Sequence, residues 1–370
     1  MNRVVSKAWL LFLMLPFLQS CHVARYFYWN VANIDDYQKF DNDTIKTDNF
    51  EPVFHYEPKK LTTPEQYTES GRVSLDEFLQ NNNTVAFALI ADDTVLKENY
   101  YNKYSDSSYV TSFSVAKSFV SALTGIAVED GAINTIDDPI TDYLTYLDKN
   151  PFEEITIRDL LHMRSGLEAN EGYYNPLGDV AKYYYGTNLK KYLAQIKRKS
   201  PPDEYFEYLS VNTQLLAAVV ETATGRPIQD YLQEKIWKPL NMESYGLWSL
   251  DSEKRSTVKA FCCLSARAMD FARFGRLYLN NGEWKGRHIV PESWIKQTLD
   301  YPEDNIDWQD YPYSFQWRVT RYGAYFAKGI KGQYIYIYPE KNIVAVRFGT
   351  SYADIDWAAF FKSLIDENFD

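Results

Sequence analysis

The spacing of Ser114 and Lys117 is the first feature of the sequence that could support covalent chemistry. A serine hydroxyl attacks a carbonyl efficiently only when a base removes its proton, and a lysine three residues later lies one helical turn away, beside the hydroxyl. Burial favours the uncharged amine, which can act as that base. The residues after Ser114 are apolar on nearly every side, so we predict a buried helix that carries Lys117 into the interior.

Other nucleophile arrangements have less support. No Gly-x-Ser-x-Gly occurs, which disfavours a Ser-His-Asp triad on a strand-to-helix turn. Ser-x-x-Lys occurs twice more, as Ser256 to Lys259 in a charged run that we interpret as hydrated, and as Ser293 to Lys296 in a helix start. The remaining alternative for Ser114 is a helix cap followed by a lysine that extends into solvent.

The elements that would position this pair are strands at both ends of the chain with helices between them. We expect a β-hairpin early in the folded part, a run of helices in the middle, three later strands and a final helix. The ranges are 84–90 and 94–101 for the hairpin, 156–163, 213–224 and 266–279 for helices, 314–319, 334–338 and 343–348 for strands, and 355–365 for the last helix. This pattern predicts an α+β fold in which the end segments share one antiparallel sheet flanked by helices. The central helices would form a second lobe, with a cleft between the lobes.

Three stretches of the sequence now support a resemblance to a known superfamily. Ser114 to Lys117, with its apolar helix, resembles the first motif of the serine β-lactamase and penicillin-binding proteins. The segment 156–167 resembles the one that follows the nucleophile helix in class C β-lactamase-like hydrolases, and we interpret His162 within it as structural. Tyr208-Leu209-Ser210 is similar to the second motif, usually Tyr-x-Asn. Serine in the third place is closer to the branch that contains esterases and 6-aminohexanoate-dimer hydrolases.

The third motif of that superfamily should lie within 329–336. Ile330 then occupies the usual basic position, Lys331 the middle place and Gly332 the glycine that allows close backbone approach. The resemblance implies that the N–H of Gln333 pairs with that of Ser114 as an oxyanion hole. No Ser-Asp-Asn or Lys-Thr-Gly is present, which argues against a class A enzyme.

The resemblance implies a serine hydrolase that cleaves an ester or amide through an acyl-enzyme on Ser114. Lys117 and Tyr208 would act as general base and acid, while Ser210, Lys331 and Gly332 would bind substrate. Tyr173 and Tyr174 are further candidates for contact with the substrate, although surface packing is the alternative for both. Two rival functions remain: a D-alanyl-D-alanine carboxypeptidase or weak β-lactamase, and a catalytically silent sensor.

The N-terminal segment has the features of a targeting signal. Two positive charges precede the apolar run 8–18, which is too short to cross a bilayer and is typical of an export signal. The run ends in Leu-Gln-Ser-Cys, which resembles a bacterial lipobox, so we expect cleavage after Ser20 and lipid on Cys21; a plain secretory peptide is the alternative. The chain would then be anchored on the extracytoplasmic side of the bacterial cell envelope.

We expect three parts along the chain: a signal peptide over 1–20, a tether or N-terminal wrap over 21–63, and the hydrolase over 64–370. Within the hydrolase, the α/β lobe would comprise about 64–129 and 287–370, and the helical lobe about 130–286. No Pro/Gly/Ser-rich linker or internal repeat divides the chain further.

Composition excludes several classes of function. Apolar residues make up 45% of the chain and charged residues 24%, as in ordinary globular proteins, and the net charge of -11 disfavours nucleic acid as a partner. The three cysteines include the neighbours Cys262 and Cys263, whose spacing disfavours a disulfide. Four histidines without a metal-binding pattern predict no metal, and we expect no cofactor and a monomer with a small-molecule substrate.

Overall fold

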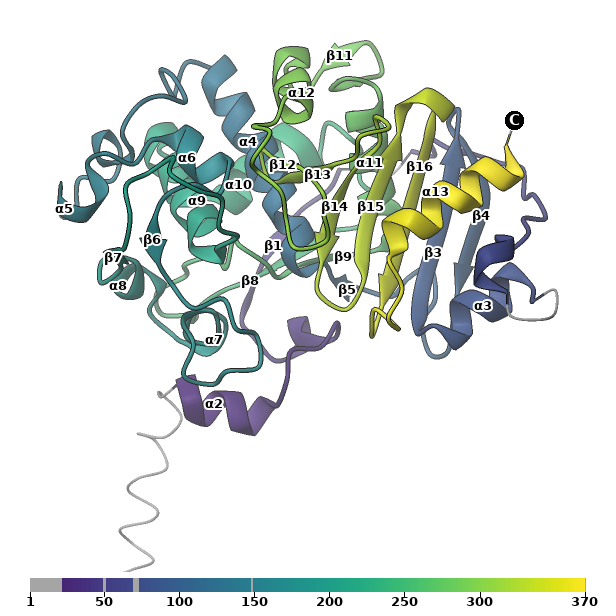
Figure 1. Ribbon diagram of the computed structural model, residues 1–370, viewed down its shortest axis with the longest axis horizontal. Coiled ribbons are helices and arrows are strands. Elements are labelled where there is room, and N and C mark those ends of the chain that lie inside the picture. Colours follow the sequence, from purple (N-terminus) through teal and green to yellow (C-terminus); the bar gives the residue numbers. More distant parts are fainter. Residues whose placement is uncertain (1–21, 49–50, 69–72, 148, 370) are drawn as a thin grey trace, which may run out of the picture.

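The computed structural model describes residues 22–48, 51–68, 73–147 and 149–369. A large twisted sheet with helices on both faces lies beside a mainly helical region (Figure 1). The predicted signal peptide and Cys21 lie outside the described residues. No helix among the described residues is both long enough and apolar enough to cross a membrane.

The large sheet joins the two ends of the folded chain. Its strands, in spatial order, are β12 (Tyr313–Ser314), β13 (Trp317–Val319), β14 (Tyr325–Gly329), β15 (Gln333–Tyr338), β16 (Ile343–Gly349), β3 (Thr84–Ala91), β4 (Thr94–Tyr100) and β2 (His55–Tyr56). All neighbours pair antiparallel except β2 and β4, which are parallel. Pairing of β16 with β3 confirms the predicted α+β fold, in which the early hairpin and the last strands share one sheet.

Alternating side chains give this sheet two apolar faces, each covered by helices. Val344 and Ile335 point into the larger core with α4 (Ala116–Glu129) and α11 (Ala268–Leu279). Phe87 and Tyr336 point to the opposite face, where α13 (Trp357–Asn368) and α3 (Leu75–Asn81) cover them. The predicted strands and helices overlap these elements. The sequence pattern missed β14, however, and it predicted one strand where the structure has β12 and β13.

The remaining elements build the helical region and its edges. The helices are α2 (His22–Trp29), α5 (Lys149–Phe152), α6 (Ile157–Leu161), α7 (Asp179–Tyr185), α8 (Leu189–Leu193), α9 (Ser210–Thr224), α10 (Ile228–Leu232) and α12 (Glu292–Leu299). Short helical turns are η1 (Asp36–Gln38), η2 (Glu65–Tyr67), η3 (Phe113–Val115), η4 (Ile140–Asp142), η5 (Gln233–Trp237) and η6 (Pro339–Lys341). A second sheet has the order β1 (Asn42–Ile45), β8 (Gly246–Ser249), β9 (Leu264–Ala266) and β5 (Val110–Thr111), and two pairs join β6 (Leu167–Glu168) to β7 (Lys197–Arg198) and β10 (Glu283–Trp284) to β11 (Arg287–His288).

Two regions bear on the expected division of the chain, in which 21–63 is either a tether or an N-terminal wrap. The described part of 21–63 is a wrap and not a tether, because β1 pairs with β8, β2 pairs with β4, and α2 packs beside α7. The predicted helical lobe, 130–286, also contributes α11, which packs on β15 and β16 of the large sheet, and the strands of the second sheet. Long-range strand pairing of this kind leaves no local signal in the sequence.

The buried ring of His162, just after α6, gives the fold a testable pH dependence. The ring packs edge-on against Phe315 at 5.0 Å between centroids and is 8% exposed. Burial, assisted by the positive charges of Arg158 and Arg164, lowers the pKa of His162 to about 4. The fold therefore favours the neutral ring, so its contribution to stability is complete above the unfolded-state pKa and is lost as the pH falls towards 4.

We predict that His162 accounts for about 3 kcal/mol of the free energy of unfolding that is lost between pH 7 and pH 4. Urea unfolding of the wild type and of His162→Phe at both pH values measures this contribution. The variant should lose correspondingly less stability on acidification. Equal losses in the two proteins would contradict the assignment.

Candidate active site

Ser114 lies at the entrance to the buried helix α4. Phe113 adopts a left-handed backbone conformation, with φ of 48°, which costs a non-glycine residue energy and is tolerated because its buried ring anchors the turn. This turn, η3, places the Ser114 side chain on the wall of a cavity of about 480 Å³. Backbone N–H groups at the start of a helix lack partners within the helix and can bind a negatively charged oxygen.

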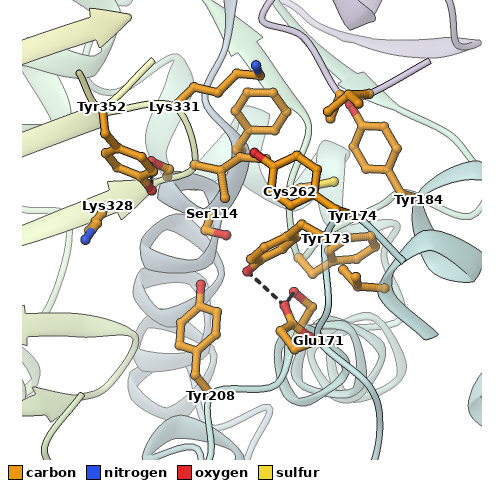
Figure 2. A pocket seen from close by; sticks show the side chains of 18 of the residues that line it. Ser114, Glu171, Tyr173, Tyr174, Tyr184, Tyr208, Cys262, Lys328, Lys331 and Tyr352 are labelled. Carbon is orange, nitrogen blue, oxygen red and sulfur yellow. Dashed lines mark hydrogen bonds between the residues drawn. The ribbon is translucent and has the colours of Figure 1, made fainter. Parts of the chain in front are cut away.

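The cavity lies where the large sheet meets the helical region, and its lining is largely apolar and aromatic (Figure 2). Its aromatic lining residues are Phe113, Tyr173, Tyr174, Tyr184, Tyr185, Phe206, Tyr208, Phe261, Trp308 and Tyr352. Its charged lining residues are Glu171, Asp307, Arg318, Lys328 and Lys331. Such a pocket fits a small organic molecule that carries only a few polar groups.

The amine of Lys117 lies in the interior, as the sequence predicted. The residue is 1% exposed, and its Nζ lies 3.1 Å from Ser114 Oγ, 3.2 Å from Ser210 Oγ and 2.7 Å from the carbonyl oxygen of Phe261. The alternative in which Lys117 extends into solvent is therefore excluded. Three oxygens satisfy an amine that would otherwise be costly to bury.

Tyr208 lines the same cavity, with its hydroxyl pointing towards Ser114 (Figure 2). Its ring lies between the amine of Lys117 and the guanidinium of Arg318, whose Nζ and Cζ atoms are 5.2 Å and 5.3 Å from the ring centroid. Arg318 is itself paired with buried Asp307 at 2.6 Å, which holds the guanidinium against the ring. Tyr208 is thus fixed by packing and charge in front of the serine.

Glu171 was not identified from the sequence. Its Oε1 accepts hydrogen bonds from the hydroxyls of Ser210 at 2.5 Å and Tyr173 at 3.0 Å, and its Oε2 accepts from the Ser210 N–H at 2.9 Å. Burial and the charge of Glu171 raise the pKa of Tyr173 well above its usual value. Ser210, Tyr173 and the exposed Tyr174 all line the cavity, and the carboxylate of Glu171 links Ser210 to Tyr173.

Gly329, at the end of β14, touches the turn that carries the nucleophile. A Cβ on Gly329 would lie 2.3 Å from the carbonyl oxygen of Ser112 and 3.2 Å from Phe113 Cβ. Only glycine allows this approach, which brings the next residue, Ile330, to the cavity wall near Ser114.

The third predicted motif therefore lies differently from expectation. Residues 330–332 form the turn between β14 and β15, and Lys331 lines the cavity whereas Gly332 and Gln333 do not. The close neighbour of Gly332 is the guanidinium of Arg347, and the fully buried Gln333 side chain exchanges hydrogen bonds with the backbone of Gly349. Ile330 and Lys331 therefore line the cavity, whereas Gln333, the predicted oxyanion donor, lies outside its lining.

Lys328 is a further cation that sequence reasoning missed. It is 7% exposed, with its amine 5.0 Å from the ring centroid of Trp308 and 5.2 Å from that of Tyr352. Burial, together with the charge of Arg318, lowers the pKa of Lys328 to about 7. Its amino group points away from Ser114 in Figure 2, so it belongs to the far side of the cavity.

The other two Ser-x-x-Lys pairs do not form such a unit. Lys259 is fully buried, contrary to its predicted hydration, with its amine 3.2 Å from the ring centroid of Phe40, while Ser256 donates its hydroxyl hydrogen to a local backbone carbonyl. Burial lowers the pKa of Lys259 well below its usual value. Lys296 pairs with Glu292 on the surface.

Cys262 and Cys263 form a disulfide, which corrects the prediction that neighbouring cysteines stay unpaired. Cys262 lines the cavity and follows Phe261, whose carbonyl holds Lys117. Cys263 has a left-handed backbone, with φ of 70°, a local geometry that the sequence did not indicate. Within the described residues, no group of three or more His, Cys, Asp or Glu side chains is placed to hold a metal ion.

Comparison with known proteins places this geometry in context. The sequence model of the family described as Beta-lactamase matches residues 75–354. The chain is 24% identical over 303 residues to 6-aminohexanoate-dimer hydrolase of Paenarthrobacter ureafaciens, a match that covers 76% of each chain. It is 30% identical to D-aminopeptidase of Brucella anthropi over 138 residues, which cover 37% of this chain and 26% of that protein.

A solved structure resembles almost the entire chain. A Bacillus anthracis protein assigned as a 6-aminohexanoate-dimer hydrolase superposes with a TM-score of 0.81 at 25% sequence identity. The match covers 92% of this chain and 93% of that one. It is therefore longer than the region that the family model matches.

We predict that Gly329→Ala slows the reaction of Ser114 with a fluorophosphonate by at least about 10-fold, because the added methyl group displaces the donors beside the nucleophile. The second-order labelling rate and the thermal midpoint are measured together. Ala327→Gly, in the same strand, controls for general loosening of β14. An unchanged labelling rate in folded Gly329→Ala would show that the close approach is dispensable.

Proposed function

The chain belongs to the beta-lactamase family, and from this premise we propose that it is a serine hydrolase that cleaves an ester or amide bond through a Ser114 acyl-enzyme. The observation that carries the proposal is the buried contact between Lys117 Nζ and Ser114 Oγ. A hydroxyl and an amine at this distance, on the wall of a cavity, form a nucleophile with its base.

In the acylation step, neutral Lys117 takes the proton of Ser114 as the serine oxygen bonds to the carbonyl carbon of the substrate. The carbonyl oxygen gains the negative charge and is held by the N–H groups of Ser114 and Ile330. Collapse of the tetrahedral intermediate breaks the bond to the leaving alcohol or amine, which takes up a proton through Tyr208. Water then gives a proton to the same groups as its oxygen bonds to the acyl carbon, the bond from that carbon to Ser114 Oγ breaks, and Ser114 takes the proton back as the acid is released.

The cavity indicates the class of substrate. Its aromatic walls favour a small substrate with a substantial apolar portion, and its cations on the sheet side, Lys328 and Lys331, favour an anionic or strongly polar end there. Two similar proteins are named 6-aminohexanoate-dimer hydrolase and D-aminopeptidase. We therefore favour short amides and esters, and keep D-amino acid peptides and β-lactams as rival substrates.

We also propose that Cys21 carries lipid and anchors the enzyme on the extracytoplasmic side of the membrane. The support is the lipobox-like sequence that ends at Cys21. The adjoining helix α2 lies at the periphery of the molecule (Figure 1). Labelling of full-length protein with radioactive fatty acid tests the modification.

We predict that Ser114→Ala abolishes fluorophosphonate labelling and that Lys117→Met slows it by about 10³-fold or more, because the members of such a unit act together. In-gel fluorescence and intact mass measure both. Ser256→Ala, which changes the serine of another Ser-x-x-Lys sequence, should label at the wild-type rate. Labelling that persists in Ser114→Ala would exclude this nucleophile.

We predict turnover of short-chain esters and linear ω-amino acid amides that depends on Ser114, with penicillins labelling the protein poorly, because no Lys-Thr-Gly motif supplies the expected carboxylate contact. A panel of esters, ω-amino acid amides, D-alanyl-D-alanine peptides and a fluorescent penicillin measures this preference. Rapid penicillin acylation or release of D-alanine would favour the carboxypeptidase alternative. Absence of any Ser114-dependent reaction would favour a sensor.

A further inference from the structure

We propose that Glu171 is a positioning residue that directs the lone pair of the Lys117 amine towards Ser114, acting through the hydroxyl of Ser210. The inference rests on the proposed function, in which neutral Lys117 is the base. It concerns the direction of hydrogens in the site, which follows from what each group can donate and accept.

The contacts of Glu171 determine where the Ser210 hydroxyl hydrogen points. Both carboxylate oxygens accept hydrogen bonds: Oε2 from the Ser210 N–H at 2.9 Å, and Oε1 from the Tyr173 hydroxyl at 3.0 Å. This is the pattern of an ionised carboxylate, which can only accept. The Ser210 hydroxyl lies 2.5 Å from Oε1 and must therefore donate its single hydrogen to Glu171. Towards Lys117, the Ser210 oxygen can then only accept.

The contacts of Lys117 determine where the hydrogens and the lone pair of its amine point. A neutral amine has two hydrogens and one lone pair. The Phe261 carbonyl, 2.7 Å from Nζ, accepts one hydrogen, and Ser210 Oγ, 3.2 Å from Nζ, accepts the other. The lone pair is left facing Ser114 Oγ at 3.1 Å, which is the arrangement that proton removal requires.

Without the carboxylate, this order is lost. The Ser210 hydroxyl could rotate and donate its hydrogen to the lone pair of Lys117, in competition with the hydroxyl of Ser114. The amine would then form an unproductive hydrogen bond in a fraction of molecules, and the base would be occupied in that fraction. Glu171 prevents this competition although it contacts neither Lys117 nor Ser114 in the hydrogen bonds of the site.

A double-mutant cycle between positions 171 and 210 tests the proposal. Glu171→Gln should slow phosphonylation of Ser114 by at least about 10-fold, since general base catalysis depends on the free lone pair. Asparagine at 210 offers Lys117 an amide oxygen that carries no hydrogen, so it needs no carboxylate to orient it. In the Ser210→Asn background, Glu171→Gln should therefore slow phosphonylation by less than about threefold.

The matched control is Glu168→Gln, which removes the same charge from an exposed position at the end of β6, three residues earlier, and should label at the wild-type rate. The thermal midpoint of each variant is measured together with its labelling rate. If Glu171→Gln costs the same factor in both backgrounds, the carboxylate acts independently of the Ser210 hydrogen and the proposal fails. Failure of the proposed function itself would look different, because the wild type would then show no Ser114-dependent labelling.

If Glu171→Gln does not fold, two variants with Glu171 intact decide the question. Ser210→Asn keeps an acceptor for Lys117 and should retain the labelling rate within about fivefold, whereas Ser210→Ala removes the acceptor and should lose about 10-fold or more. Equal losses in these two variants would overturn the role assigned to the Ser210 oxygen and, with it, the role of Glu171.

Discussion

The buried amine of Lys117 is the constraint on which the rest of the site depends. Lys117 is 1% exposed, so its amine is tolerated only if it finds hydrogen-bond partners, and the chain supplies three oxygens from three separate elements. Ser114 comes from the turn before α4, Ser210 from the start of α9, and the Phe261 carbonyl from the segment before β9. The relative placement of these elements therefore has to be accurate to a fraction of an ångström.

A polar side chain in the interior provides much of that placement. Gln316, between β12 and β13, donates to the carbonyls of Leu160 and Leu161 in α6 and accepts from the hydroxyl of Thr213 in α9. The backbone carbonyl of Gln316 accepts a hydrogen bond from the hydroxyl of Ser118 in α4. One residue of the sheet thus ties together the three helices around the nucleophile, and because every bond is buried, breaking any of them leaves an unpaired polar group.

The sequence predicted the parts of this design that have a local signature. Ser114 and Lys117 are three residues apart at the head of an apolar helix, and the alternation in the strands indicated one sheet. Glu171 could not be found this way, because it lies in an irregular loop and acquires its role only when α9 brings Ser210 beside it. The role of Gly329 could not be predicted from the sequence either, because its need for close approach to Ser112 is a tertiary constraint.

The aromatic rings around Lys117 add a second constraint, which concerns charge. A base that takes a proton becomes an ammonium, so the same cavity must accommodate the neutral amine before the transfer and the cation after it. Neutral amines tolerate apolar surroundings, whereas the cation is stabilised by the ring faces of Tyr208 and Phe261, whose centroids lie 5.2 and 5.8 Å from Nζ. The hydrogen bond from Lys117 Nζ to the carbonyl oxygen of Phe261 also strengthens as the amine gains charge. These interactions grow during proton transfer while the rings keep water away from the amine, so they favour the transition state over the resting site.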